Sequence, residues 1–380
     1  MEMRINRERL AEEFVRLCEI SSPSREEKPV ADYLKRVYAD LGADFSFEDD
    51  SASKTGSESG NLIFRFAGNN DSAPIFFACH MDTVKPGNGV KVKRTGDIFT
   101  SRGDTVLGSD DKSGIAPLIE LIRLCKENGT AHRPIELVFT TCEEIGLQGA
   151  KALDYQRLQA EYGYALDSTG IDKVIIGAPA ANRIRVDVHG TAAHAGINPE
   201  GGVSAFLVAA QAITKIKLGR IDEESTANIG IIKGGVATNI VPAQLMLKGE
   251  IRSHSTEKLA RYTDDFKTAF LDTIAAWPVS DDAAYKPPTV DLKVGQEYPV
   301  MRLKESDTVV ETIRQAGLAL GREQSLIIAG GGSDANIFNG YGLPTAIVAT
   351  GMSDVHTTEE SIDLDDMVKL TELLYTIACM

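Results

Sequence analysis

Histidine and acidic side chains that could bind metal ions follow apolar, strand-like runs at several points in this sequence. Each of them ends such a run or opens a predicted helix; they are His80 with Asp82, Asp110, Glu143 with Glu144, Asp167 and His356. The two adjacent glutamates would repel each other after a buried run unless a cation lay nearby. One histidine and one carboxylate for each of two ions, with a further carboxylate as a bridge, is a donor set that suits Zn²⁺, Co²⁺ or Mn²⁺. The sequence therefore predicts a site for two divalent metal ions, with zinc as the first choice.

Some of these carboxylates are predicted to support the metal site without binding a metal ion. A histidine ligand normally has its second ring nitrogen fixed by a carboxylate, and Asp82 stands two residues after His80 in "HMDTV". One glutamate of the pair at 143–144 can bind a metal ion while the other stays free as a base. Taken singly, each residue also has a structural explanation. Asp110, for example, could cap the helix that follows it.

Alternating strands and helices must position these side chains. Apolar runs predict strands at 61–66, 74–79, 135–140 and 345–349, and helical spacing predicts helices at 7–18, 26–41, 113–124 and 307–320. Such alternation favours a mainly parallel sheet covered by helices on both faces. In these sheets, active residues gather at the carboxyl ends of the strands. The polar stretch Asp49–Gly60 is expected to be a flexible loop.

The pattern changes near residue 180. Strands are expected at 183–189, 226–232 and 244–251, and helices at 203–216 and 256–274. A chain of 380 residues exceeds the usual size of a single core, so two domains are expected. We therefore predict an α/β fold in which a discontinuous domain, residues 1–178 and 300–380, holds the metal ligands. A small α+β domain, residues 179–299, is inserted into it.

Charge and composition narrow the class of function. The net charge of −15 argues against nucleic acid or an anionic membrane as a partner, because no positive field would attract phosphate. No apolar run approaches the roughly 18 residues needed to span a bilayer, and the first residues do not resemble a signal peptide. The five cysteines are odd in number and form no CxxC pair, which is typical of reduced thiols. The expected location is the cytoplasm.

Several motifs in a fixed order identify a family. The stretches "HMDTV", "GSDDKSG", "EEIGLQGA", "HGTAAHAG", "GGVATNIVP", "GEIRSH" and "GGGSDANIFNG", the last followed by a histidine, stand between about residues 75 and 356. Together they resemble the M20 family of dinuclear metallopeptidases. Within that family they are most similar to the peptidase T (tripeptide aminopeptidase) branch. The match covers nearly the whole chain.

The resemblance implies a role for each candidate ligand. One metal ion would be bound by His80 and Asp167, the other by Glu144 and His356, and Asp110 would bridge the two. Glu143 would be the general base, and Asp82 would orient His80. The family pattern also implies a cis peptide bond between Asp110 and Asp111.

The inserted domain matches the lid domain of the family, which can mediate dimerisation. In this resemblance His194 would stabilise the oxyanion of the reaction. Asn239 and Arg252 would hold the carboxylate of the substrate.

The function expected from these motifs is metal-dependent hydrolysis of an amide bond in short peptides, by an aminopeptidase that releases N-terminal residues from tripeptides. A carboxypeptidase, or an amidohydrolase of N-acyl or N-carbamoyl amino acids, could use the same site. A non-catalytic protein that binds metal or peptide is a third alternative. Degenerate relatives usually lose the base or a ligand, however, and this chain retains all of them.

Overall fold

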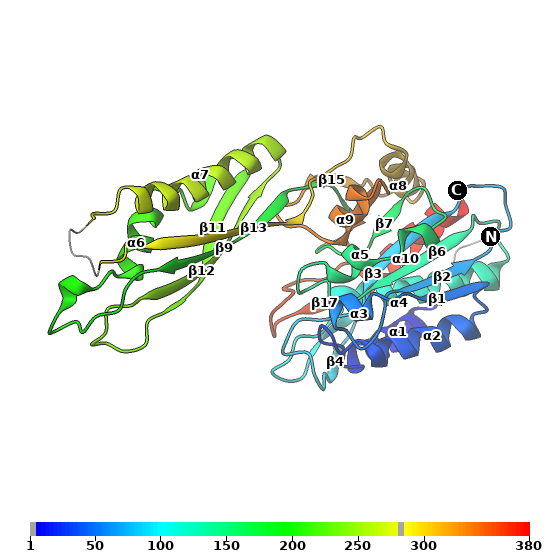
Figure 1. Cartoon of the computed structure of the whole chain (residues 1–380). Helices are drawn as coiled ribbons and strands as arrows, with labels where there is room; N and C mark the ends of the chain where they lie inside the picture. The colour runs from blue at the N-terminus through cyan, green and yellow to red at the C-terminus, as the bar shows by residue number, and fades with distance from the viewer. Residues whose placement is uncertain (1–4, 280–284) are drawn as a thin grey trace. The chain divides into compact units, whose positions relative to one another are not determined.

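A computed structural model describes residues 5–279 and 285–380 of the chain (Figure 1). The chain divides into two compact units. Unit 1 contains residues 1–177 and 301–380, and unit 2 contains residues 178–300. The sequence predicted the corresponding boundaries at 178/179 and 299/300.

Unit 1 is built on a mixed nine-stranded sheet. Its strand order is β1-β2-β6-β3-β7-β16-β8-β14, with β15 paired to β8. The strands are β1 (Phe45–Glu48), β2 (Leu62–Phe66), β3 (Ile75–His80), β6 (Ile135–Thr140), β7 (Gly163–Ala165), β8 (Lys173–Ala178), β14 (Met301–Arg302), β15 (Ser325–Ile328) and β16 (Thr345–Val348).

The centre of this sheet is parallel. Strand β3 pairs in parallel with both β6 and β7, and β7 pairs in parallel with β16. Every residue of β3, β6 and β16 is buried, as expected for strands covered on both faces. In the register of the sheet His80 is opposite Thr140, so the carboxyl ends of β3 and β6 lie at the same edge.

Helices cover the sheet of unit 1, as Figure 1 shows. Helices α1, α4 and α10 pack against one another, while α5 and α9 form a second group together with α3. The helices are α1 (Arg7–Glu19), α2 (Lys28–Asp40), α3 (Ala52–Thr55), α4 (Ser109–Asn128), α5 (Gln148–Ala152), α8 (Thr308–Ala319), α9 (Asp334–Gly340) and α10 (Leu364–Cys379). The predicted α/β class, with a mainly parallel central sheet and helices on both faces, is confirmed.

The expected flexible loop at 49–60 is wrong. The segment contains α3, and five of its polar side chains are buried, those of Asp49, Ser51, Thr55, Ser57 and Ser59. Asp49, 7% exposed, accepts hydrogen bonds from the backbone of Ser51 and Asn61. The hydroxyl of Ser57 donates to the buried carboxylate of Glu27. Polar composition suggested a solvated loop, but here the polar groups bind one another and fix the segment.

Unit 1 also contains a small sheet that the sequence did not predict. It has the order β17-β5-β4, with β4 at Val92–Thr95, β5 at Ile98–Ser101 and β17 at Ser361–Asp363. These strands are three or four residues long and mostly polar, so they carry little hydrophobic signal.

Unit 2 is an antiparallel sheet of five strands packed against two helices. The strand order is β10-β11-β12-β9-β13, formed by β9 (Ala180–His189), β10 (Gly219–Asp222), β11 (Ser225–Gly234), β12 (Gln244–Ser253) and β13 (Thr289–Tyr298). Helices α6 (Ala205–Ile213) and α7 (Thr256–Ala275) begin at Ser204 and Ser255, whose side chains accept backbone N–H bonds as N-caps. Strands β10 and β13 were not predicted. Strand β10 is short and polar, whereas β13 has Val290, Leu292 and Val294 alternating with polar residues, a strand pattern that the sequence analysis missed.

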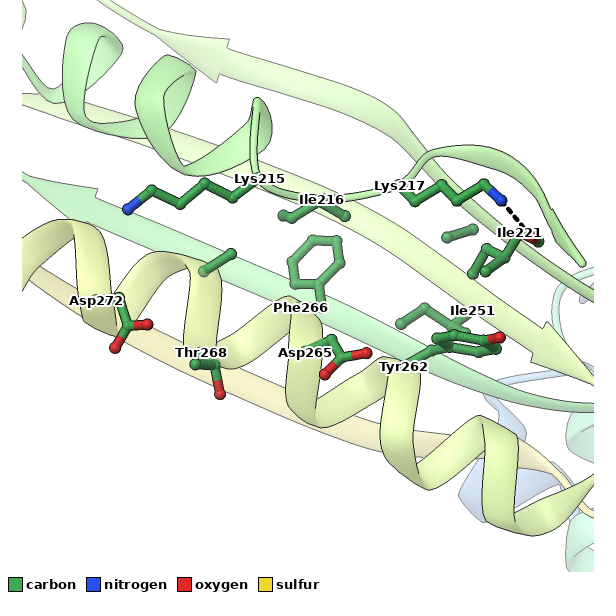
Figure 2. Close-up of a pocket in the computed structure, with 12 residues that line it drawn as sticks. Lys215, Ile216, Lys217, Ile221, Ile251, Tyr262, Asp265, Phe266, Thr268 and Asp272 are labelled. Atoms are coloured by element: carbon green, nitrogen blue, oxygen red, sulfur yellow. Dashed lines mark hydrogen bonds between the residues drawn. The ribbon is translucent and has the colours of Figure 1, made fainter.

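A cavity of about 370 Å³ lies within unit 2, between α7 and the segment that connects α6 to β10 (Figure 2). Lys215 and Lys217 line it from that segment, and Asp265 and Asp272 line it from α7. The residues that line this cavity include none of the predicted site residues.

Over residues 5–279 and 285–380, no helix has both the length and the apolar character needed to cross a bilayer.

Candidate metal centre

His80 is the last residue of β3, and its side chain is 2% exposed. Its Nε2 lies 2.9 Å from Oδ1 of Asp110. Its Nδ1 lies 2.9 Å from the backbone carbonyl oxygen of Asp82 and 3.5 Å from the Asp82 carboxylate. One ring nitrogen therefore faces the other candidate ligands, while the opposite nitrogen is held by Asp82.

Asp110 joins the two histidines. Its Oδ2 lies 3.1 Å from Nε2 of His356, and that same nitrogen lies 3.0 Å from Oε1 of Glu144. Asp110 thus has one oxygen directed to each imidazole, as a bridging carboxylate requires. The peptide bond between Asp110 and Asp111 is cis, as the resemblance implied.

The donor atoms fit a metal site. One ligand atom from each of His80, Asp110 and Glu144 lies within 4.8 Å of the others. Nitrogen and oxygen ligands at about 2.0–2.1 Å from a tetrahedral zinc ion lie about 3.3 Å from one another. The contacts of 2.9–3.1 Å between imidazole and carboxylate are close to that spacing. The chemistry of the set, imidazole nitrogen with carboxylate oxygen, is also that of zinc, cobalt or manganese sites.

The electrostatics of this cluster follow from its close contacts. Hydrogen bonds to Asp110 and Glu144 raise the pKa of His356 to about 10. Burial opposes the charge on His80, but Asp110 and Asp82 outweigh it and raise its pKa. The same two imidazoles lower the pKa of Asp110 against the effect of its burial. The carboxylates therefore favour positive charge at the point where metal ions are predicted.

Glu143 and Asp167 add further negative charge. Both are partly buried and follow β6 and β7 at the carboxyl edge of the sheet. Burial raises the pKa of Glu143, and the Asp167 carboxylate raises it further. Burial raises the pKa of Asp167, with a second contribution from Asp110. Such a group of acids is stable in ionised form only beside cations.

The carboxylate of Asp82 has partners that the sequence did not suggest. Its Oδ1 accepts the backbone N–H of Glu143 at 2.9 Å, and its Oδ2 accepts that of Glu144 at 3.2 Å. The hydroxyl of Ser24 donates to Oδ2 at 2.6 Å. Asp82 is fully buried, so these bonds fix the segment that carries both glutamates.

Sequence reasoning missed one acid beside the cluster. Asp334, the first residue of α9, is 6% exposed; the Thr140 hydroxyl donates to one of its oxygens, and the other oxygen has no hydrogen-bond partner among the described residues. Burial raises the pKa of Asp334 to about 6. The stretch "GGGSDANIFNG" was used only as a family motif. The signal available for Asp334 was an acid at the start of a helix after a glycine run.

In unit 2, two of the predicted substrate-contacting residues are neighbours. His194 forms an isolated β-bridge with Ile240, and the backbone N–H of Ala195 donates to the carbonyl of Asn239 at 2.9 Å. Both His194 and Asn239 are exposed. The N–H of Gly196 donates to Nδ1 of His194 at 3.2 Å, so the neutral ring carries its proton on Nε2.

Arg252 lies near the end of β12, whereas Asn239 precedes the start of that strand at Gln244. Eight residues of extended strand separate Gln244 from Arg252, or roughly 26 Å at about 3.3 Å per residue. The guanidinium of Arg252 pairs with Glu250, with Nε 3.0 Å from Oε1. Unit 2 therefore brings His194 and Asn239 together but places Arg252 apart from them.

An imidazole–carboxylate cluster at the carboxyl edge of a mainly parallel sheet, with two further acids beside it, is typical of metal-dependent hydrolases. Comparison with known proteins agrees with this class. Residues 76–379 match peptidase family M20/M25/M40, and the chain belongs to this family.

Three relatives are similar over almost the whole chain. The YqjE protein of Bacillus subtilis (strain 168) is 41% identical over 374 residues, which cover 98% of each chain. The crystal structure of aminopeptidase PepT from Bacillus cereus has 41% identity and a TM-score of 0.89, with 98% of each chain covered. A tripeptidase from Staphylococcus aureus has 34% identity and a TM-score of 0.93, and covers 100% of this chain and 99% of its own.

Proposed function

We propose that this protein is a dinuclear metallo-aminopeptidase that releases N-terminal residues from tripeptides. The observation that carries the proposal is the chain of contacts from His80 through Asp110 to His356 and Glu144, with Glu143 beside it. The similar solved structures named as an aminopeptidase and a tripeptidase support the choice of substrate.

Five residues would hold two divalent ions. His80 and Asp167 are assigned to one ion, Glu144 and His356 to the other, and Asp110 to both. Two such ions, when bound, supply positive charge that polarises the peptide carbonyl and lowers the pKa of water. Zinc is the first choice for the ions, with cobalt or manganese as alternatives.

Glu143 is assigned as the general base. Its carboxylate would take a proton from the attacking water and return it to the leaving amine. Asp82 holds the backbone nitrogen of Glu143 at 2.9 Å, which limits the movement of the carboxylate during both transfers. Burial and the Asp167 carboxylate raise the pKa of Glu143, and this favours acceptance of the proton.

Residues of unit 2 are assigned to two groups of the substrate, the developing oxyanion and the carboxylate. His194 carries its proton on Nε2 when neutral and can donate it as a hydrogen bond to the developing oxyanion, a contribution worth about 10²–10³ in rate at comparable sites. The carboxylate of the peptide is assigned to Arg252. Asn239 was expected to hold the same carboxylate, but it lies beside His194, beyond the opposite end of β12 and roughly 26 Å along the strand from Arg252, so within one chain the two side chains cannot share it. The planar fork of arginine suits a carboxylate better than lysine does.

The same proposal includes three further points. Unit 2 would act as a lid, it would mediate a homodimer, and the protein would be located in the cytoplasm. Five free cysteines accord with a reducing compartment. Size-exclusion chromatography with light scattering tests the dimer.

The test of the function compares one tripeptide in three forms: free, N-acetylated and C-amidated. The aminopeptidase proposal expects the free peptide to lose its N-terminal residue, the acetylated form to resist, and a chelator to abolish turnover. Cleavage of the acetylated form in preference to the free peptide would favour the alternatives, a carboxypeptidase or an N-acyl or N-carbamoyl amidohydrolase. Two bound metal ions without turnover would indicate a non-catalytic binding protein.

A further inference from the structure

A buried carboxylate in unit 1 connects the segments that carry Asp110 and His356. Glu360 is 1% exposed, and its Oε1 accepts hydrogen bonds from the Ser109 hydroxyl at 2.6 Å and from the Asp110 backbone N–H at 3.0 Å. Its Oε2 accepts the backbone N–H of Gly108 at 2.9 Å. Donors from three consecutive residues therefore meet one side chain that lies 250 positions after Asp110.

The segment Gly108–Asp110 needs an acceptor from elsewhere in the chain. It precedes the regular turns of α4, because Asp110 (φ −84°, ψ 99°) and Asp111 (φ −119°, ψ 31°) have non-helical backbone angles. A buried backbone N–H group must find an acceptor, and the carboxylate of Glu360 accepts those of Gly108 and Asp110. Asp110 is thereby fixed through its own backbone nitrogen.

Glu360 also lies at the base of the loop that carries His356. The backbones of Ser353 and Ser361 pair at this base, with N to O distances of 2.9 and 3.1 Å. Between them His356 has φ 64°, a conformation that the loop must hold in place. Because Glu360 precedes Ser361 directly, its side chain joins the base of the loop to the start of α4.

We propose that Glu360 is a positioning residue that fixes Asp110 relative to His356, so that both can bind the same metal ion. The inference rests on the metal centre of the proposed function. It assigns to Glu360 no contact with metal or substrate. Its effect passes through the backbone of Gly108–Asp110 on one side and through the His356 loop on the other.

The experiment measures zinc affinity by competition with a chromophoric chelator in metal-free protein. Glu360→Gln keeps the size of the side chain but replaces one accepting oxygen by an NH₂ group, which cannot accept. Glu359→Gln is the matched control, because Glu359 is adjacent, equally charged and exposed. We expect Glu360→Gln to weaken zinc binding by about 10–100-fold, the range for residues that orient metal ligands, and Glu359→Gln to leave it unchanged.

A second variant covers the case in which Glu360→Gln does not fold. Ser109→Ala removes one of the three donors to Glu360 and leaves the carboxylate in place, so we expect a smaller loss of zinc affinity in the same direction. The gain in Tm on adding zinc is measured for each protein, and it should fall in the same order. Wild-type affinity in both variants, or an equal loss in Glu359→Gln, would overturn the inference.

The zinc titration needs no substrate, which separates this inference from the proposed function. If wild-type protein cleaves tripeptides and Glu360→Gln binds zinc normally, the inference alone fails. If Glu360→Gln weakens zinc binding but wild-type protein cleaves no peptide, the proposed function alone fails.

Discussion

The carboxylate of Asp82 accepts the backbone N–H of Glu143 at 2.9 Å, across the carboxyl ends of β3 and β6. The same carboxylate accepts the N–H of Glu144, and the backbone carbonyl of Asp82 lies 2.9 Å from Nδ1 of His80. One buried residue therefore positions the proposed base and two proposed ligands. Its role is broader than the orientation of His80 that its spacing in the sequence suggested.

Asp82→Ala should lower both zinc affinity and kcat. The change leaves two N–H groups without their acceptor and frees the segment that carries Glu143 and Glu144. We expect zinc affinity to fall by about 10–100-fold, measured by chelator competition. Asp71→Ala, which removes an exposed carboxylate of the same unit, serves as control. Unchanged zinc affinity in Asp82→Ala would contradict the positioning role.

Glu143→Gln should retain bound metal but lose turnover. Glutamine has nearly the same shape as glutamate but cannot take a proton from water. General acid–base catalysis contributes about 10²–10⁴-fold in rate, and kcat should fall by that factor while metal content stays at the wild-type value. Glu144→Gln provides the comparison, because loss of a ligand should lower metal content as well. Normal turnover by the Glu143→Gln enzyme would refute the assignment of the base.

Arg252→Lys should raise KM for tripeptides with a free carboxylate and change kcat less. The lysine ammonium is a single point charge and cannot make the paired hydrogen bonds of guanidinium. Steady-state kinetics on free and C-amidated peptides make the comparison, with Arg261→Lys, an exposed position on α7, as control. If KM rose equally for the amidated peptide, Arg252 would not be the carboxylate clamp.

The pKa of Asp334, about 6, predicts a pH-dependent stability of the metal-free protein. In the unfolded chain this carboxyl group ionises near pH 3.9, so as pH rises from about 4 to 6 the unfolded state releases its proton first. Stability is therefore lost over that range, by about 3 kcal/mol when complete.

Asp334→Asn removes the loss of stability that comes from ionising a buried carboxyl group. The asparagine side chain can still accept the hydrogen bond of Thr140. The metal-free variant should have a higher Tm than wild-type protein at pH 7.5, and the difference should vanish near pH 4. Differential scanning calorimetry at both values measures it. A variant that is less stable than wild type at pH 7.5 would show that the Asp334 charge stabilises the fold.

Much of this molecule follows from local sequence pattern. Long apolar runs such as Ile75–His80 are buried on both faces and could be identified as central strands. Side chains that follow parallel strands must lie at one edge of the sheet. The structure brings His80, Asp110, Glu144 and His356 into contact at that edge. The short polar strands have no such signal, and β13 has a different one, the alternation of Val290, Leu292 and Val294 with polar residues, which was missed.

The features that the sequence did not predict depend on contacts between residues far apart in the chain. Glu360 stands in the charged pair "EE", which is usually solvated, yet it is buried and accepts the backbone N–H groups of Gly108 and Asp110. The polar segment 49–60 is also held by hydrogen bonds, because the Asp49 carboxylate accepts both the backbone N–H and the side-chain amide of Asn61. Hydrogen-bond partners at such separations cannot be inferred from one sequence.

The proposed function depends on five side chains that share a pair of metal ions. Anomalous diffraction from crystals of zinc-loaded protein would locate those ions. Two peaks about 3.5–4 Å apart are expected, both within ligand distance of Asp110, with His80 and Asp167 at one peak and Glu144 and His356 at the other. A single peak, or peaks away from these side chains in zinc-saturated protein, would contradict that arrangement.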